Sequence, residues 1–321
     1  MQYLKQRIRK LSLTLTLPLL AAGLSNSESA RAFGPENHRL LSTAAVTYYK
    51  NNCDADQSLA WADAEVVGKG ARGEDSIFRL TRVFNWHFFN PYKDLQASKR
   101  LVNPTPDRYL SGAEKQIRKG IRKSDSKLVS KAVGAYAHYI QDNANPAHIS
   151  PIYHGPFKKD QFDEWPLPVY SIFDAGFCKD TDTAYTKLLA ESSEQPQLNL
   201  LHKVFEGAFK QTARVYDQTF SATIDGQAIT LQWRDFWDDC GGDDFCNYED
   251  ALLGNHFGKY RIPVVPEKKI EGSTCEAGAQ CTVEIDFDQY HQFAQQQART
   301  AALNTVVALL VVSDAYLQGS P

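Results

Sequence analysis

The stretch from Gly134 to His148, GAYAHYIQDNANPAH, constrains this chain more than any other. Apolar residues before and within it recur at helical spacing, which predicts a buried helix. His138 and Asp142 are four residues apart, so they lie on one face of that helix. A polar pair in an apolar helix costs free energy unless it is hydrogen-bonded or bound to metal. Pro146 should end the helix within about one turn, and His148 should follow on a loop that aims it elsewhere.

This pair has two interpretations. In the first, His138 is a buried histidine that hydrogen-bonds to Asp142 one turn later, which is a common arrangement. In the second, both side chains bind one metal ion. We prefer the second, because His148 adds a third residue of ligand type and more such residues recur along the chain.

The N-terminal segment has the pattern of a secretory signal peptide. Basic residues cluster between Lys5 and Lys10, an apolar stretch extends from Leu11 to Leu24, and Ala30-Arg-Ala32 fits an A-x-A cleavage site. The apolar stretch has 14 residues, too few to span a bilayer comfortably. We therefore expect cleavage after Ala32, and a mature protein that is secreted or periplasmic.

The charge balance bears on the substrate. Five of the 35 basic residues and one of the 38 acidic residues lie in residues 1–32, so the mature chain would carry a net charge of −7. An acidic protein is poorly suited to broad binding of polyanions. Nucleic acid is therefore the less favoured substrate, although metal ions can supply local positive charge.

All six cysteines follow the leader. An even number of cysteines in an exported chain indicates disulfides. Connectivity does not follow from sequence, but two local pairs are plausible and would leave a third, distant pair: Cys240 with Cys246, Cys275 with Cys281, and Cys53 with Cys178. Because no cysteine lies near the histidine motifs, we do not expect cysteine ligands to zinc.

Several short motifs precede the central stretch. The mature chain would begin Phe33-Gly-Pro-Glu36-Asn-His38, and Trp61-Ala-Asp63 and His87-Phe-Phe-Asn-Pro follow. Together with His138-x3-Asp142-x5-His148, and in this order, these motifs resemble the zinc-dependent phospholipase C and single-strand nuclease superfamily. The resemblance is nearer to bacterial zinc-dependent phospholipase C, and it covers residues 33 to 165.

The resemblance implies a site with three zinc ions. Asp142 would bridge two of them, His138 would bind one of this pair, and His148 would bind the third ion. The new N-terminal residue, Phe33, would chelate zinc through its own amine and carbonyl, and His38 would complete that site.

Three earlier residues also acquire expected roles from the resemblance. Asp63 would bind the first zinc and act as the general base, and His87 would bind the same ion. Glu36, the fourth mature residue, would help to hold a choline headgroup. An anionic side chain suits a quaternary ammonium group, although a glutamate in the first turn of a helix can simply complement the helix dipole.

The last ligands of the third zinc are open, because the segment that directly follows His148 departs from the family pattern of a histidine with a carboxylate four residues later. One solution is His154 with Asp163 or Glu164. The other is His202 with Glu206, which share a helix face. We prefer His154 with Asp163, because they lie close to His148 in a segment rich in Pro and Gly.

The expected fold is mainly α-helical, with a small, disulfide-rich region that contains β-strands. The signal peptide (1–32) would precede a helical zinc hydrolase domain (33–218). Residues 219–287 form the β-containing region, with a hairpin at an Asp-Gly turn within 222–233 and a strand at 282–287. A C-terminal helix over 288–318 would pack on the helical domain. We also expect a helix at 39–50, a glycine-rich loop at 66–80 and a basic amphipathic segment at 111–123, which is either a solvated face or a contact with an anionic membrane.

The sequence therefore favours an exported zinc-dependent phospholipase C that hydrolyses glycerophospholipids, such as phosphatidylcholine, to diacylglycerol and a phosphorylated headgroup. Its partner would be phospholipid at a membrane surface, without nucleic acid, and the protein would be a monomer. A zinc-dependent single-strand nuclease of the same superfamily is the alternative. A secreted binding module with structural zinc is a third interpretation.

Overall fold

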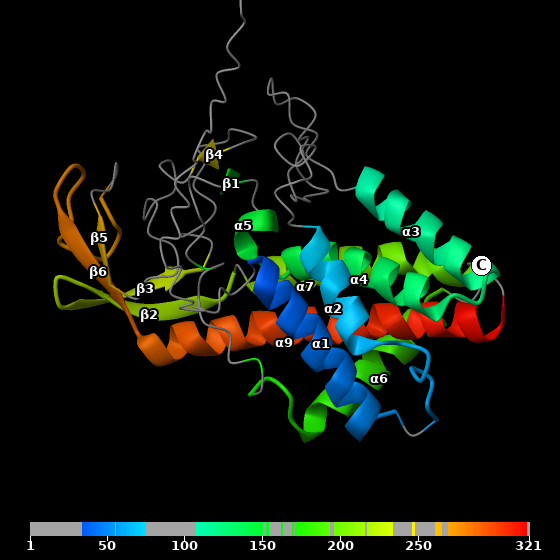
Figure 1. The fold of residues 1–321 in the computed structure, drawn as a ribbon. Coiled ribbons are helices and arrows are strands. Elements are labelled where there is room, and N and C mark those ends of the chain that lie inside the picture. The colour runs from blue at the N-terminus through cyan, green and yellow to red at the C-terminus, as the bar shows by residue number, and fades with distance from the viewer. Residues whose placement is uncertain are drawn as a thin grey trace, which may run out of the picture.

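The protein is described by a computed structural model that covers residues 34–54, 56–74, 107–149, 152–153, 162, 169, 171–192, 196–215, 217–233, 246–247, 261–264 and 269–319. It is mainly helical, with a small sheet at one end of the helical part (Figure 1). The helices are α1 (Pro35–Asn52), α2 (Ala64–Gly73), α3 (Asp107–Arg122), α4 (Ser126–Asp142), α5 (Pro146–Ile149), α6 (Ala175–Ala190), the 3-10 turn η3 (Gln197–Asn199), α7 (Leu200–Val215) and α9 (Phe287–Leu317). The coarse prediction of a mainly α fold is confirmed.

The long helix α9 forms the centre of the helical part, and α1, α4, α6 and α7 pack against it (Figure 1). Its residues from Ala294 to Val312 are largely buried. By length and composition α9 could cross a membrane, but most of its apolar window is buried inside the protein. It is therefore a core helix, as the sequence predicted.

Glycine residues allow helices α2 and α4 to pack closely against each other. A Cβ atom placed on Gly134 of α4 would lie 2.0 Å from the carbonyl oxygen of Val67, and one on Gly70 of α2 would lie 2.2 Å from that of Lys131. These glycines therefore let two helix backbones meet. The prediction of a loop at 66–80 is wrong over α2, because these glycines serve helix packing rather than a turn.

Strands β2 (Thr219–Ile224), β3 (Gln227–Gln232), β5 (Arg261–Val264) and β6 (Cys281–Ile285) form a sheet of order β3-β2-β6-β5. Strands β2 and β3 form an antiparallel hairpin, and Ile224 pairs with Gln227. Asp225 and Gly226 have φ angles of 47° and 83°, which two-residue hairpin turns require. The predicted hairpin is confirmed. Strand β1 (Ile152–Tyr153) pairs separately with β4 (Cys246–Asn247) in parallel.

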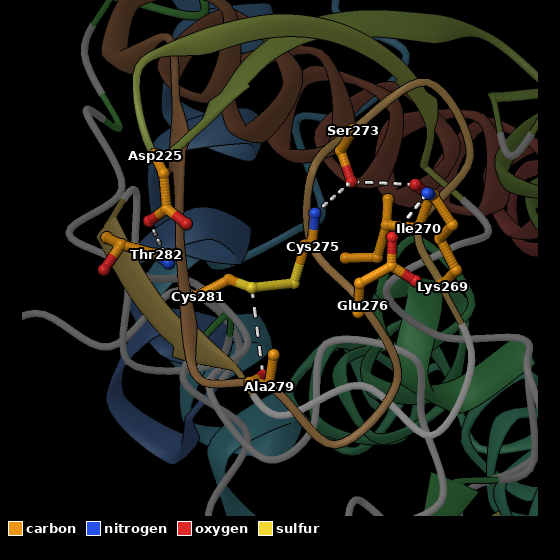
Figure 2. Close-up of a disulfide and its surroundings, with 9 residues drawn as sticks. All are labelled: Asp225, Lys269, Ile270, Ser273, Cys275, Glu276, Ala279, Cys281 and Thr282. Carbon is orange, nitrogen blue, oxygen red and sulfur yellow. Dashed lines mark hydrogen bonds and ion pairs between the residues drawn. A yellow bond between two sulfur atoms is a disulfide. The ribbon is translucent and has the colours of Figure 1, made fainter.

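Two of the plausible disulfides are present. Cys53–Cys178 joins the end of α1 to α6, and Cys275–Cys281 closes a short loop before β6 (Figure 2). In that loop the Cys275 amide donates to Ser273 Oγ at 3.1 Å. Cys240 and the predicted signal peptide, residues 1–32, lie outside the described residues. Two disulfides are typical of proteins from oxidising compartments.

Candidate metal centre

Helices α1 and α4 bring three residues of ligand type together. His38 lies in the first turn of α1, which begins with Pro35, a residue favoured at that position because it needs no hydrogen-bond partner for its nitrogen. His138 and Asp142 lie in the last turns of α4. One ligand atom from each of the three residues lies within 4.8 Å of the others. The predicted pairing of His138 with Asp142 on one helix face is confirmed, and the tertiary structure adds His38.

Asp142 lies between the two histidines. His38 Nε2 is 3.2 Å from Asp142 Oδ1, and His138 Nε2 is 3.2 Å from Asp142 Oδ2. The centroids of the two imidazole rings are 4.1 Å apart. Each carboxylate oxygen thus faces a different histidine. A carboxylate in this position can bind one cation through each oxygen.

The cluster is buried. His38, His138 and Asp142 are 1%, 0% and 1% exposed. An ionised carboxylate at such a depth is costly unless a positive charge and hydrogen bonds compensate for it. Asp142 therefore requires a positive partner, either a protonated histidine or a metal ion.

The neighbouring residue Gln141 fixes the tautomer of His38. Thr305 Oγ1 donates its only proton to the carbonyl oxygen of Ala301 at 2.8 Å, so it can only accept from Gln141 at 3.0 Å. The group of Gln141 that faces Thr305 and Ser42 is therefore the amide nitrogen. The amide oxygen then faces His38 Nδ1 at 2.8 Å, and that ring nitrogen must carry a proton.

This orientation decides what can lie between His38 and Asp142. When Nδ1 carries the proton of a neutral imidazole, Nε2 presents a lone pair toward the carboxylate oxygen, and the two would repel. A proton or a metal ion must then lie between them. Two ligands of a tetrahedral zinc ion lie about 3.3 Å apart, because zinc bonds to nitrogen and oxygen are about 2.0–2.1 Å long. Both observed separations are 3.2 Å, so the spacing is compatible with a shared metal ion such as zinc and equally with a direct histidine–aspartate ion pair.

His148 lies nearer to the cluster than the sequence predicted. It belongs to the short helix α5, and His148 Nδ1 is 3.7 Å from Asp142 Oδ2. The expectation that a loop aims His148 elsewhere is wrong. Pro146 ends the preceding turn but also begins α5, and this returns the chain toward α4. Three histidines, His38, His138 and His148, thus surround the carboxylate of Asp142.

Asp63 does not join this cluster. Its side chain is exposed and caps α2 by accepting from the amide of Val66 at 3.1 Å. Its backbone amide donates to Ser130 Oγ at 3.2 Å, and Ser130 precedes His138 on α4 by about 12 Å of helix. Trp61 of the same motif donates to Ser313 of α9. In this structure the Trp-Ala-Asp motif therefore anchors α2 rather than supplying a ligand or a base.

Glu36 likewise forms contacts outside the cluster. Its carboxylate forms ion pairs with Arg39 at 2.6 Å and Arg72 at 3.5 Å. Glu36 and His38 are two residues apart on α1, so they do not face each other. The pairing of α1 with α2 accounts for this glutamate, and the structure provides no support for a role in headgroup binding.

Sequence reasoning missed two buried polar residues that hydrogen-bond to His38 or to the residue after His138. Gln141 is one, although its position next to Asp142 in an apolar helix is a usable signal. Glu74, the C-cap of α2, is the other. It is buried and accepts a hydrogen bond from Tyr139 Oη at 3.0 Å. Because Tyr139 follows His138, this bond ties α2 to the ligand-bearing end of α4.

The remaining predicted ligands fall into two groups. His202 and Glu206 are 3.3 Å apart on α7, where both are substantially exposed, and they are not part of the group of three clustered residues. The other predicted ligands lie outside the described residues: Phe33, His87, His154, Asp163 and Glu164.

The comparisons with known proteins do not identify a family for this chain. No family model, curated protein or solved structure matches it.

Proposed function

We propose that the protein is an exported zinc-dependent phosphodiester hydrolase, and most specifically a phospholipase C. Its substrate would be a glycerophospholipid such as phosphatidylcholine, and its products diacylglycerol and a phosphorylated headgroup. The observation that carries this proposal is the position of Asp142, with one oxygen toward His38 and the other toward His138. A bridging carboxylate is suited to a site with more than one metal ion.

The ligand chemistry favours a hydrolytic site over a structural one. Structural zinc sites are closed by four protein ligands and are usually rich in cysteine. Here the cluster contains only histidine and aspartate. Two disulfides, Cys53–Cys178 and Cys275–Cys281, bind four of the cysteines. These facts weigh against a binding module with structural zinc.

The protein contributes preorganisation. Zinc would supply a Lewis acid for the phosphoryl oxygens and a bound water of lowered pKa. Gln141 holds His38 in the tautomer whose Nε2 can bind metal, and Tyr139 fixes the end of α4 through Glu74. Because the site is buried, its charges act on the substrate with less screening by water. The proposal assigns no role to Asp63.

A single-strand nuclease of the same superfamily is the second candidate. The spacing of Phe33 and His38 resembles that branch, and a phosphodiester is the reacting group in both substrates. The acidic composition of the chain argues for the lipid. Only the choice of substrate separates the two candidates, so they must be tested together.

The test uses protein matured at Phe33. Zinc content is measured by elemental analysis, and turnover of phosphatidylcholine and of single-stranded DNA is measured side by side. We expect bound zinc and release of phosphocholine, both lost in Asp142→Asn and retained in His291→Gln, a control at a histidine that is outside the cluster and bonds to Gln295. DNA cleavage without lipid turnover would establish the nuclease instead. A protein that binds no zinc and turns over neither substrate would refute the proposal.

A further inference from the structure

The hairpin formed by α3 and α4 exposes a concentrated positive charge. We define the cationic face as six residues that are all exposed: Lys115, Lys119 and Arg122 on α3, Lys123 in the connecting turn, and Lys127 and Lys131 on α4. The sequence predicted a basic amphipathic helix here, and the structure confirms the helix. The metal centre uses none of these residues.

The cations lie in two rows, one on each helix of the hairpin. On α3 the cations recur at intervals of four and three residues, opposite the buried Ile117 and Ile121, so they share one side of the helix. Lys127 and Lys131 are four residues apart on α4. The two helices pack tightly where they join, since a Cβ atom on Gly120 would lie 2.6 Å from Val129 Cγ2. Both rows end near the turn that carries Lys123.

The charge of this face is not neutralised. Within the described part of the chain, none of the six cations forms an ion pair with an acidic side chain. The segment 111–131 contains only two acids, Glu114 and Asp125, and Asp125 caps α4 by accepting from the amide of Leu128. This concentration occurs in a chain whose overall net charge is −3. Composition alone therefore does not explain it.

The C-terminal end of α9, which carries an exposed apolar residue, lies beside the same turn. Tyr316 Oη donates to the carbonyl oxygen of Ser124 at 3.4 Å, which places the C-terminal end of α9 next to the connection between α3 and α4 (Figure 1). The next residue, Leu317, is 66% exposed, and among the described residues Phe287 is the one other large apolar side chain exposed in this way. Cations next to an apolar side chain are the combination by which proteins bind membrane surfaces.

We propose that the cationic face, with Leu317, binds the anionic surface of a phospholipid bilayer. Five of the six cations are lysines, which act as flexible point charges and suit a layer of headgroups without a fixed pattern. A face for single-stranded nucleic acid would also need aromatic side chains for base stacking, and Tyr316, the described aromatic residue at this turn, is half-buried with its ring against Trp61. The inference deepens the proposed phospholipase function, because that enzyme must reach its substrate at a membrane.

The expected effect follows from the number of charges. Each lysine or arginine near an anionic membrane strengthens binding about fivefold. Removal of three charges should therefore weaken binding about a hundredfold. The triple variant Lys119→Gln/Lys123→Gln/Lys127→Gln removes them from the centre of the face. The matched control Lys179→Gln/Lys187→Gln/Lys210→Gln removes three exposed lysines from α6 and α7, with the same change in net charge.

The experiment is vesicle sedimentation with the mature protein. The vesicles contain either phosphatidylcholine alone or phosphatidylcholine mixed with phosphatidylglycerol, and circular dichroism verifies that both variants are folded. We expect binding that depends on phosphatidylglycerol, weakens with salt and falls about a hundredfold in the face variant but little in the control. Equal losses in both variants would show that only net charge matters, and this would overturn the proposal, as would binding that is indifferent to phosphatidylglycerol.

Two further measurements distinguish membrane binding by the cationic face from the proposed phospholipase activity and from nucleic-acid binding. Lipid turnover is measured in the same samples. Charge-dependent vesicle binding without lipid turnover would support the cationic face as a membrane-binding surface and contradict the phospholipase function. Lipid turnover without charge-dependent binding would support the phospholipase function and contradict the membrane-binding role of the cationic face. A single-stranded oligonucleotide is titrated in parallel. If the face variant loses oligonucleotide binding but binds vesicles as well as the wild type does, the face recognises nucleic acid and the lipid proposal is wrong.

Discussion

Replacement of Gln141 by leucine tests the link between hydrogen bonding and metal binding. The wild-type side chain contacts His38 Nδ1 at 2.8 Å, Ser42 Oγ at 2.7 Å and Thr305 Oγ1 at 3.0 Å. Leucine has a similar size but can make none of these bonds. His38 would then be able to place its proton on either ring nitrogen, and a proton on Nε2 competes directly with a metal ion.

The magnitude can be worked out from these contacts. Thr305 keeps its bond to Ala301, so the buried groups left without their Gln141 partner are the His38 ring nitrogen and the Ser42 hydroxyl. Each such group costs about 1–3 kcal/mol, so Gln141→Leu should lower the free energy of unfolding by about 2–6 kcal/mol. Loss of a hydrogen bond that orients a metal-binding histidine typically lowers metal affinity about 10–100-fold.

The assay is zinc binding by competition with a chromophoric chelator, combined with NMR detection of the His38 tautomer. Gln141→Glu keeps an acceptor for Nδ1–H and should retain affinity. The matched control is Gln297→Leu, which removes another buried glutamine whose partners are Ala144 and Thr212 rather than a histidine. It should lose stability but keep zinc. If Gln141→Leu loses stability and still binds zinc as tightly as the wild type, the tautomer argument is wrong.

Three further predictions concern stability, each measured by urea unfolding. Gly134→Ala should destabilise by at least about 1–3 kcal/mol, because its Cβ would meet a backbone oxygen of α2, whereas Gly207→Ala, with open space around it, should stabilise slightly. Removal of the Cys53–Cys178 disulfide should lower the free energy of unfolding by about 5 kcal/mol, because the disulfide closes a loop of 125 residues in the unfolded chain. A smaller loss than that caused by removal of the Cys275–Cys281 disulfide, which closes a short loop, would contradict this prediction. Burial raises the pKa of Glu114, so the stability it contributes is present in acid and lost as pH rises through the folded-state pKa. Glu114→Gln should therefore be more stable than wild type at neutral pH and indistinguishable from it in acid.

Much of the local structure was predictable because it depends on neighbours in the chain. The helical periodicity around His138 places Asp142 on the same face, and the Asp225-Gly226 dipeptide supplies the φ angles that a tight hairpin needs. The apolar run within α9 likewise predicts a core helix. In each case the deciding interactions lie within a few residues of one another.

Local motifs were a poor guide where one residue type serves several purposes. Asp63 matches a ligand motif but caps a helix, and Glu36 matches a headgroup contact but pairs with arginines. The glycines at 68 and 70 predicted a loop, yet they permit close contact between helices. Aspartate, glutamate and glycine are common in both roles, so only their three-dimensional neighbours distinguish them.

The sequence by itself determined that a buried helix presents His138 and Asp142 together, because their spacing matches the pitch of a helix. Only the tertiary structure decided which residues complete the cluster. His38 lies 104 positions before Asp142 in the chain and reaches it because α1 and α4 pack around α9. Gln141 orients His38 by a direct hydrogen bond, and Thr305 of α9 in turn orients the Gln141 amide. Contacts between such distant segments depend on how helices pack, and helix packing is a property of the whole core rather than of any motif.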